Sequence, residues 1–267
     1  MSDEVRVELI DRIRVITIDR PRARNAIGLR TMAELDAALV EIGEGDAAVV
    51  VITGGGDRAF VSGGDLRELE AIRTVDNAER MARRMRSVLD RMVSLPMPVI
   101  AALNGHALGG GAEVAVAADL RIAADDIRIG FTQSSLGIMP AWGGAERLTK
   151  MVGRSQALLL LCGGQALAAS QAREIGLVDV VMPRRDFETG WRGLAARFAS
   201  LPATATRAIK GVVAAVSPAT FPATEAGSIR AFAELWAAPE HWERTAAAEL
   251  KRRQATSTEG SGQSKRA

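Results

Sequence analysis

The stretch Ala102-Leu103-Asn104-Gly105-His106-Ala107-Leu108-Gly109-Gly110-Gly111-Ala112-Glu113 determines how the rest of the chain is interpreted. An apolar run over residues 98–103 is typical of a buried strand, and the alanine- and valine-rich residues after Glu113 favour a helix. The glycines between them let the backbone approach a bound group closely. The first turn of the helix would offer unpaired N–H groups and the positive end of its dipole to a developing negative oxygen.

Glu113 would lie in that first turn, beside whatever the N–H groups hold. A carboxyl group next to an oxyanion-binding turn is suited to moving a proton beside a polarised carbonyl. A helix cap or tight packing would use the same glycines, and an acidic residue in a first helical turn is electrostatically favourable in any protein. The stretch alone therefore leaves a catalytic and a structural interpretation open.

The bulk composition is that of an ordinary globular protein. The 267 residues are 48% hydrophobic and 25% charged, which is enough to bury a sizeable core. The formal net charge of +2 is weak evidence for nucleic-acid binding, so no nucleic-acid partner is expected. The N-terminus resembles neither a signal nor a transit peptide, and no run of about 18 apolar residues occurs, so we expect a cytoplasmic protein that does not associate with membranes.

The residue types that most often carry catalysis or bind metals are scarce. Cys162 is the single cysteine, which excludes an intrachain disulfide and a cysteine metal cluster. It follows an apolar run over residues 157–161, which predicts a buried structural thiol. The two histidines, His106 and His241, belong to no visible metal or Ser/His/Asp pattern, and tyrosine is absent.

Strand and helix patterns alternate through most of the chain. Alternating apolar residues on either side of Asp11-Arg12 predict a hairpin, and apolar residues at three- and four-residue spacing over 29–42 predict a helix. Further strands are expected over residues 47–53, 98–103, 120–123, 127–131 and 178–182, and further helices over 81–92, 109–118, 143–152, 155–161 and 168–175. From Phe187 onward only helical patterns remain.

This alternation predicts an α/β core over residues 1–185 with a helical segment over 186–253 appended to it. The last residues, 254–267, are small and polar, and they predict a disordered tail.

A second glycine-containing turn, Ala59-Phe60-Val61-Ser62-Gly63-Gly64-Asp65-Leu66, follows another strand region. It lacks the Gly-Lys-Ser/Thr ending of a P-loop, and no GxGxxG pattern follows a strand in this chain. Ser62 does not stand in a Gly-x-Ser-x-Gly nucleophile elbow. The turn therefore predicts none of these three common sites.

Four sequence motifs together resemble the enoyl-CoA hydratase/isomerase (crotonase) family. The second turn is followed, after about forty residues, by Asn104-Gly105-x-Ala107-Leu108-Gly109-Gly110-Gly111-x-Glu113. Pro21-x-x-x-Asn25-Ala26 precedes both, and Leu136-Gly137-Ile138-Met139-Pro140-x-Trp142-Gly143-Gly144 follows them. The resemblance runs in order through about residues 5–182, whereas the C-terminal helices match only loosely.

The resemblance implies a crotonase-like spiral of strand–strand–helix units with a C-terminal helical segment, and trimers that often pair into hexamers. It implies an acyl-CoA thioester whose carbonyl oxygen is held by the main-chain N–H groups of Gly64 and Gly110, each donor contributing about 3 kcal/mol of transition-state stabilisation. Coenzyme A would be part of the substrate, so no separate cofactor and no metal is expected. The substrate-binding residues that it implies are Arg22, Arg24, Ala26, Ala59, Val61, Ser62, Gly63, Asp65, Leu66, Gly109, Pro140 and Trp142.

The sequence departs from the family pattern at a Pro-Glu pair, whose positions are occupied here by Thr132 and Gln133. Glu113 matches the glutamate that directs water in the family's hydratases, but their second glutamate is replaced here by Gln133. Glutamine cannot transfer a proton as a carboxyl group does, although it can orient a water or a substrate carboxylate. The departure weakens the case for ordinary two-glutamate hydration and for double-bond isomerisation.

Three functions therefore remain open. The first is an acyl-CoA enzyme of enoyl-CoA hydratase/isomerase type, in which Glu113 acts as acid and base while Gln133 positions water or substrate. The second is an alkylmalonyl-CoA decarboxylase, because residues 129–144 also resemble ethylmalonyl-CoA decarboxylases, which lack the second glutamate. The third is a CoA-ester- or RNA-binding protein with little catalysis, using a basic helix face. That face would comprise Arg80, Arg83, Arg84 and Arg86.

Overall fold

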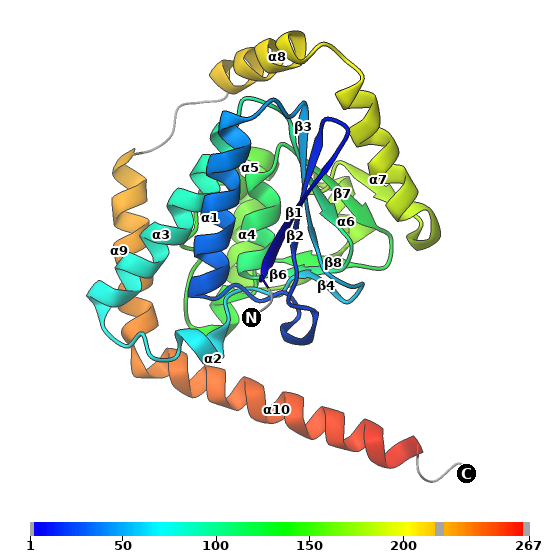
Figure 1. Cartoon of the computed structure of the whole chain (residues 1–267). Helices are drawn as coiled ribbons and strands as arrows, with labels where there is room; N and C mark the ends of the chain where they lie inside the picture. Colours follow the sequence, from blue (N-terminus) through cyan, green and yellow to red (C-terminus); the bar gives the residue numbers. More distant parts are fainter. Residues whose placement is uncertain (1–2, 217–221, 264–267) are drawn as a thin grey trace.

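The computed structural model describes residues 3–216 and 222–263, in which strands and helices alternate before a helical C-terminal part (Figure 1). The strands are β1 (Val5–Ile10), β2 (Ile13–Ile18), β3 (Val49–Gly54), β4 (Ala59–Val61), β5 (Val99–Leu103), β6 (His106–Leu108), β7 (Leu120–Ala124), β8 (Arg128–Gly130), β9 (Ala166–Ala168) and β10 (Val180–Met182). The α-helices are α1 (Leu29–Glu44), α2 (Leu66–Leu69), α3 (Val75–Ser94), α4 (Gly110–Ala117), α5 (Gly144–Gly163), α6 (Ala169–Glu174), α7 (Arg184–Ala199), α8 (Ala203–Val216), α9 (Pro222–Ala237) and α10 (Pro239–Gln263). Two 3-10 helices are η1 (Pro21–Ala23) and η2 (Gln133–Leu136).

Two sheets organise the core. Within the described residues the larger sheet has the strand order β1-β2-β3-β5-β7-β10, and the smaller has the order β4-β6-β8-β9. The β1–β2 hairpin is antiparallel, with Val5 opposite Ile18, whereas β2, β3, β5, β7 and β10 pair in parallel. Parallel neighbours need crossover connections, and in this chain the helices between the strands supply most of them.

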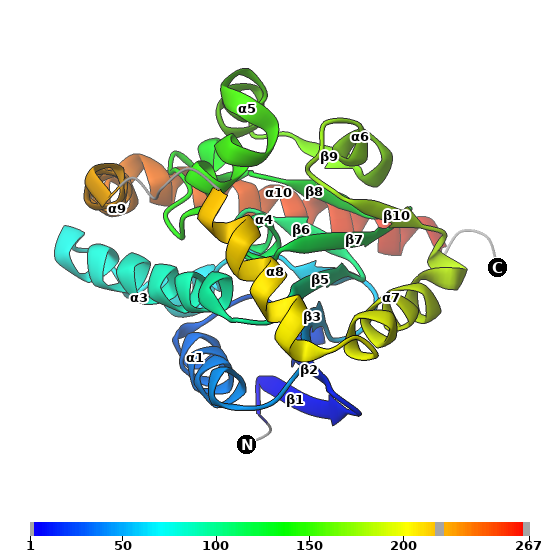
Figure 2. The ribbon, with the colours of Figure 1, turned by 90° about the horizontal axis from the view of Figure 1, so that it is seen from above.

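Helices cover both faces of the larger sheet. Figure 2 shows α1 and α3 on one side of it and α7 on the other. Strand β3 is consequently buried on both faces, and its residues 49–52 are a continuous apolar run without exposed surface. Among the described residues, no helix combines the length and the apolar character needed to cross a bilayer.

The C-terminal part folds back onto the N-terminal half. Helix α9 packs along α3 (Figures 1 and 2), whose methionines line the core as the sequence predicts. The indole N–H of Trp236 donates to the Ile72 carbonyl at 2.7 Å. The buried imidazole of His241 contacts both Trp236 and Trp242, and its Nδ1 lies 2.8 Å from the Leu136 carbonyl oxygen of η2. The end of the chain therefore supports the short helix that carries Gln133.

Most predicted elements are found, with differences that have local causes. Strands β6 and β9 were not predicted because each has three residues, too few for an alternating pattern to show. The helices expected over 143–152 and 155–161 are the two parts of α5, which bends at Gly153, where φ is 78°. A left-handed φ of this kind favours glycine.

The prediction of a buried Cys162 is wrong, because the thiol is exposed. Helix α5 buries Ala157 and Leu160, while Leu158 and Leu159 on its other face are 48% and 69% exposed. The apolar run therefore includes residues on both faces of the helix, of which the core covers only one. Cys162 lies on the exposed face.

Helix α10 runs to Gln263, through most of the tail that was predicted to be disordered, and the disorder of that tail stays a prediction. The alanine-, lysine- and arginine-rich residues before the tail favour a helix, and a helix extends at little cost once it has formed. Residues 264–267 lie outside the described residues. The division into a core over 1–185 and a helical segment over 186–253 stays a prediction; the helical part of the chain begins with α7 at Arg184.

Candidate active site

The Gly64 turn is fixed by pairing with the segment before α1. Gly64 and Ile27 form a parallel bridge, in which the Ile27 N–H donates to the Gly63 carbonyl and the Asp65 N–H donates to the Ile27 carbonyl, both at 2.9 Å. Successive N–H groups of an extended chain point to opposite sides, so the Gly64 N–H points away from Ile27. Within the described residues it has no protein acceptor.

The Gly110 turn connects β6 to α4. Gly109 adopts a φ of 57° and a ψ of −118°, which only glycine adopts readily, and its N–H donates to the Gly130 carbonyl at 2.9 Å. Gly110 is the first residue of α4, so its N–H has no partner within the helix. In the described part of the chain this N–H also has no acceptor elsewhere.

The two turns lie in contact because glycines face each other across them. A Cβ atom on Gly63 would lie 3.5 Å from the Gly110 nitrogen, and one on Gly111 would lie only 1.8 Å from the Val61 carbonyl oxygen. The predicted convergence of the two turns is therefore present. Whether the two N–H groups bind a thioester oxygen stays a prediction at this point.

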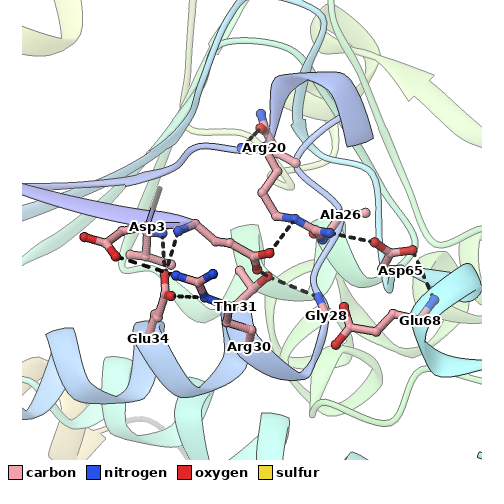
Figure 3. Close-up of polar contacts among 12 residues, drawn as sticks. Asp3, Arg20, Ala26, Gly28, Arg30, Thr31, Glu34, Asp65 and Glu68 are labelled. Atoms are coloured by element: carbon pink, nitrogen blue, oxygen red, sulfur yellow. Dashed lines mark hydrogen bonds and ion pairs between the residues drawn. The ribbon is translucent and has the colours of Figure 1, made fainter. Parts of the chain in front are cut away.

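The residue after Gly64, Asp65, belongs to an ion-paired cluster with Arg20 (Figure 3). The Asp65 carboxylate caps α2 by accepting from the Arg67 and Glu68 N–H groups, and it also accepts from Arg20 Nη2 at 2.9 Å. Arg20 further donates to the Ala26 carbonyl. Arg20 was not recognised from the sequence, since it precedes the Pro21 motif and its partner is 45 residues away.

Glu113 and Gln133, the two residues predicted to be catalytic, are brought together. Glu113 lies in the first turn of α4, is 2% exposed, and its Oε1 accepts from Gln133 Nε2 at 3.0 Å. Its Oε2 accepts from the main-chain N–H groups of Trp142 and Gly144, at 2.7 and 2.9 Å. Three donors thus fix a buried carboxyl group next to the Gly110 turn.

The residues around Trp142 explain the Gly143-Gly144 pair of the sequence motif. Gly143 has a φ of 87°, and a Cβ on Gly144 would lie 2.3 Å from Glu113 Cγ, so each position requires glycine for its own reason. The Trp142 carbonyl accepts from the largely buried Arg147 at 2.7 Å. Arg147, which also pairs with Asp90, is a second residue that the sequence did not reveal.

Burial raises the pKa of Glu113 to about 7, although the N–H groups of Gly144 and Trp142, the positive charge of Arg147 and the Gln133 amide all act to lower it. Loss of water around the carboxylate therefore outweighs the donors. A carboxyl group with this pKa can both accept and release a proton near neutral pH.

We expect the stability of the protein to fall as the pH rises from about 4.5 to about 7. The pKa of Glu113 is 4.5 in an unperturbed chain and about 7 in the fold, so in this range the folded protein holds a proton that the unfolded chain has lost. The loss amounts to about 3 kcal/mol and is complete above the folded pKa. Urea unfolding across this pH range would measure it against Glu113→Gln, whose profile should lack this loss. If the free energy of unfolding changed with pH in the same way in wild type and in Glu113→Gln, the raised pKa of Glu113 would be contradicted.

A cavity of about 430 Å³ opens beside both turns. Three arginines line it, Arg24 from the first motif, Arg58 from the β3–β4 connection and Arg184 from the start of α7. Its other lining residues are Asp57, Ala59, Ser62, Gly105, His106, Leu108, Asp126 and Ile127.

The predicted substrate-binding residues fall into several groups. Arg24, Ala59 and Ser62 line this cavity, whereas Arg22 is exposed and lies outside its lining. Ala26, Val61, Gly63, Gly109 and Pro140 are buried in the segments that meet at the two turns, and Asp65 and Leu66 begin α2. Trp142 lies beside both donor glycines. Substrate contact by each of them stays a prediction.

The predicted basic helix face on α3 is present only in part, because Arg80, Arg83 and Arg84 are exposed whereas Arg86 is buried. Arg86 is 5% exposed and pairs with Glu146 at 2.7 Å. Arg83 pairs with Glu79 on its own helix at 2.6 Å. The exposed basic side chains of this face are therefore Arg80, Arg83 and Arg84, and RNA binding through them stays a prediction.

Comparison with known proteins agrees with this geometry. The enoyl-CoA hydratase/isomerase family model matches residues 9–254. The short-chain-enoyl-CoA hydratase of Clostridium acetobutylicum is 39% identical over 182 residues, which are 67% of this chain and 69% of that relative. The crotonyl-CoA hydratase of Syntrophomonas wolfei is 33% identical over 209 residues, 78% and 80% of the two chains.

Solved structures give the same result. The enoyl-CoA hydratase of Bacillus anthracis, 30% identical, superposes with a TM-score of 0.78 over 93% of this chain and 96% of that chain. An enoyl-CoA hydratase/isomerase of Mycobacterium paratuberculosis, 24% identical, has the same fold, with a TM-score of 0.85 over 92% and 99%.

The fold is thus the α/β crotonase fold, which confirms the predicted fold class. The chain belongs to the enoyl-CoA hydratase/isomerase family. It is an acyl-CoA-processing enzyme of hydratase/isomerase type, as the family resemblance implied.

Proposed function

We propose that the protein hydrates a 2-enoyl-CoA, with Glu113 as the acid and base and the Gly64 and Gly110 N–H groups as the oxyanion-binding donors. The observation that carries this proposal is the placement of Glu113, a buried carboxyl group with a pKa of about 7, one helical turn from Gly110. The relatives that are hydratases of short-chain enoyl-CoA and crotonyl-CoA support the choice of reaction.

In this mechanism the two N–H groups hold the thioester oxygen and stabilise the enolate, each by about 3 kcal/mol. Glu113 takes a proton from a water whose oxygen bonds to the β-carbon, while the electrons of the double bond move toward the thioester oxygen. The protonated Glu113 then delivers its proton to the α-carbon as the carbonyl re-forms. One carboxyl group thus serves both steps.

Gln133 is proposed to orient the water. Its Nε2 is used by Glu113, and its Oε1 is buried without a hydrogen-bond partner among the described residues. A buried amide oxygen without a partner is unfavourable, and an incoming water would satisfy it. The water would then lie beside the carboxyl group that deprotonates it.

The cavity of Arg24, Arg58 and Arg184 is proposed to hold the phosphates of coenzyme A, which belongs to the substrate and not to a separate cofactor. Guanidinium groups suit phosphate oxygens in charge and geometry. We also propose a trimer or hexamer, because α5 and α8 expose Leu159, Ile209 and Val212 by more than 60% each. Light scattering after gel filtration tests the oligomeric state.

Decarboxylation of an alkylmalonyl-CoA is the second candidate, favoured by the amide at position 133. Loss of CO2 from such a thioester also leaves a thioester enolate, without the β-hydroxyl of the hydration intermediate, so the two donors serve it without a second carboxyl group. Crotonyl-CoA and ethylmalonyl-CoA offered side by side distinguish the two functions. Loss of the enoyl absorbance supports hydration, whereas CO2 release without hydration overturns it in favour of decarboxylation.

Replacing Gln133 with glutamate is expected to raise kcat/KM for crotonyl-CoA by about tenfold, because a second carboxyl group would share the proton transfers that Glu113 performs alone. The initial rate of hydration measures this effect. Gln171→Glu, on α6, is the control, since Gln171 caps its own helix through the Ala168 N–H. An unchanged or lower rate in Gln133→Glu would contradict the role given to Gln133.

A further inference from the structure

The indole of Trp142 lies against Gly110 and close to Gly64, the two glycines whose N–H groups have no protein acceptor among the described residues. A Cβ on Gly110 would lie 2.2 Å from Cζ3 and 2.6 Å from Cη2 of the indole, and a Cβ on Gly64 would lie 3.9 Å from Cη2 and Cζ2. The six-membered edge of one ring therefore contacts both turns. At 5% exposure, Trp142 is as well buried as a core residue.

The backbone of Trp142 is fixed from both sides. Its N–H donates to Glu113 Oε2 and its carbonyl accepts from Arg147, each at 2.7 Å. Gly143, which follows, is in a left-handed conformation that few other residues adopt. The indole is thus anchored by its hydrogen-bonded backbone and packed against Gly110.

We propose that this indole is the wall that restricts the enzyme to short acyl chains, an inference that rests on the proposed function. With the thioester oxygen on the Gly64 and Gly110 N–H groups, the α- and β-carbons lie between these groups and the Glu113 carboxyl group. Glu113 is held there by the Trp142 N–H, so the reacting carbons lie beside residue 142. In this proposal the indole occupies the space next to the β-carbon, into which the further methylenes of a longer acyl chain would extend.

Binding of saturated acyl-CoAs tests the wall without relying on turnover. Calorimetry with butyryl-CoA and decanoyl-CoA should show that wild type prefers the short ligand. Trp142→Leu should reduce this preference at least tenfold, since the fit of one or two methylenes changes selectivity by about 10–200-fold. Trp142→Phe removes less volume and should reduce the preference by a smaller factor. It provides the test if Trp142→Leu does not fold. Both variants keep the main-chain N–H that holds Glu113.

Trp191→Leu is the matched control, because Trp191 is equally buried, at 2% exposure, but lies on α7. It should leave the preference between the two ligands unchanged. A folded Trp142 variant, verified by circular dichroism, with the wild-type preference would overturn the inference. If the Trp142 variants shift the preference but the wild-type protein does not hydrate crotonyl-CoA, the hydration proposal is wrong. The inference that Trp142 limits the chain length would then still stand.

Discussion

Replacing Glu113 with glutamine is expected to lower kcat for crotonyl-CoA about 10³-fold and to change KM only a few-fold. General acid–base catalysis contributes about 10²–10⁴-fold, and here one carboxyl group is proposed to perform both proton transfers. Glutamine has the same shape, and its side-chain oxygen can still accept from the Trp142 and Gly144 N–H groups. Steady-state kinetics near pH 8 would measure both constants: the fall in kcat reports the lost proton transfer, and the nearly unchanged KM reports that the substrate still binds.

The variant should also be more stable than wild type above pH 7, because it no longer buries a charge. Glu79→Gln is the control, since Glu79 pairs with Arg83 on α3 and its replacement should change neither the kinetics nor the pH dependence of stability above about pH 5, where this carboxylate is charged in both states. A Glu113→Gln enzyme that retains a tenth of the wild-type kcat would exclude Glu113 as the acid and base.

Gly111→Ala is expected to destabilise the protein by about 3 kcal/mol and to remove most of its activity. The added Cβ would lie 1.8 Å from the Val61 carbonyl oxygen and 2.7 Å from its carbon, which are backbone atoms that no side-chain rotation can move. Overpacking at such a site costs about 1–3 kcal/mol or more, because α4 and β4 must separate. Their separation would also draw the Gly110 turn away from the Gly64 turn.

Urea unfolding and the hydration rate measure the two effects of Gly111→Ala. Gly193→Ala is the matched control, since Gly193 lies within α7 with no atom within 4 Å of the new Cβ. It should stabilise the protein by about 0.5–1 kcal/mol, as alanine does in a helix interior. Wild-type stability of Gly111→Ala would mean that the two turns do not pack as closely as described.

The features that the sequence predicted are those with strong local signals. The apolar run of β3 and the methionine stripe of α3 repeat over enough residues to reveal their structure and their buried sides. Glu113 was predicted for the same reason, since the glycines that place it immediately precede it. Its neighbour Gln133 required a family resemblance, because 20 residues separate the two side chains.

The features that were missed depend on contacts between distant segments. Strand β9 exists because Leu167 pairs with Ile129 of β8, and nothing in its three residues indicates this. Arg20 and Arg147 lie in ordinary surroundings in the sequence and gain their roles from Asp65 and Asp90. The exposure of Cys162 depended on which face of α5 the core covers, which periodicity within one helix cannot reveal.

The bond from His241 to the Leu136 carbonyl also bears on how this enzyme is made. The two residues are 105 positions apart, so a ribosome adding about 5–20 residues per second needs about 5–20 s to supply the second after the first. Over that interval the nascent polypeptide already contains Glu113 and Gln133 but not the support beneath η2. Translation thus delivers Glu113 and Gln133 before the residue that supports η2 from below.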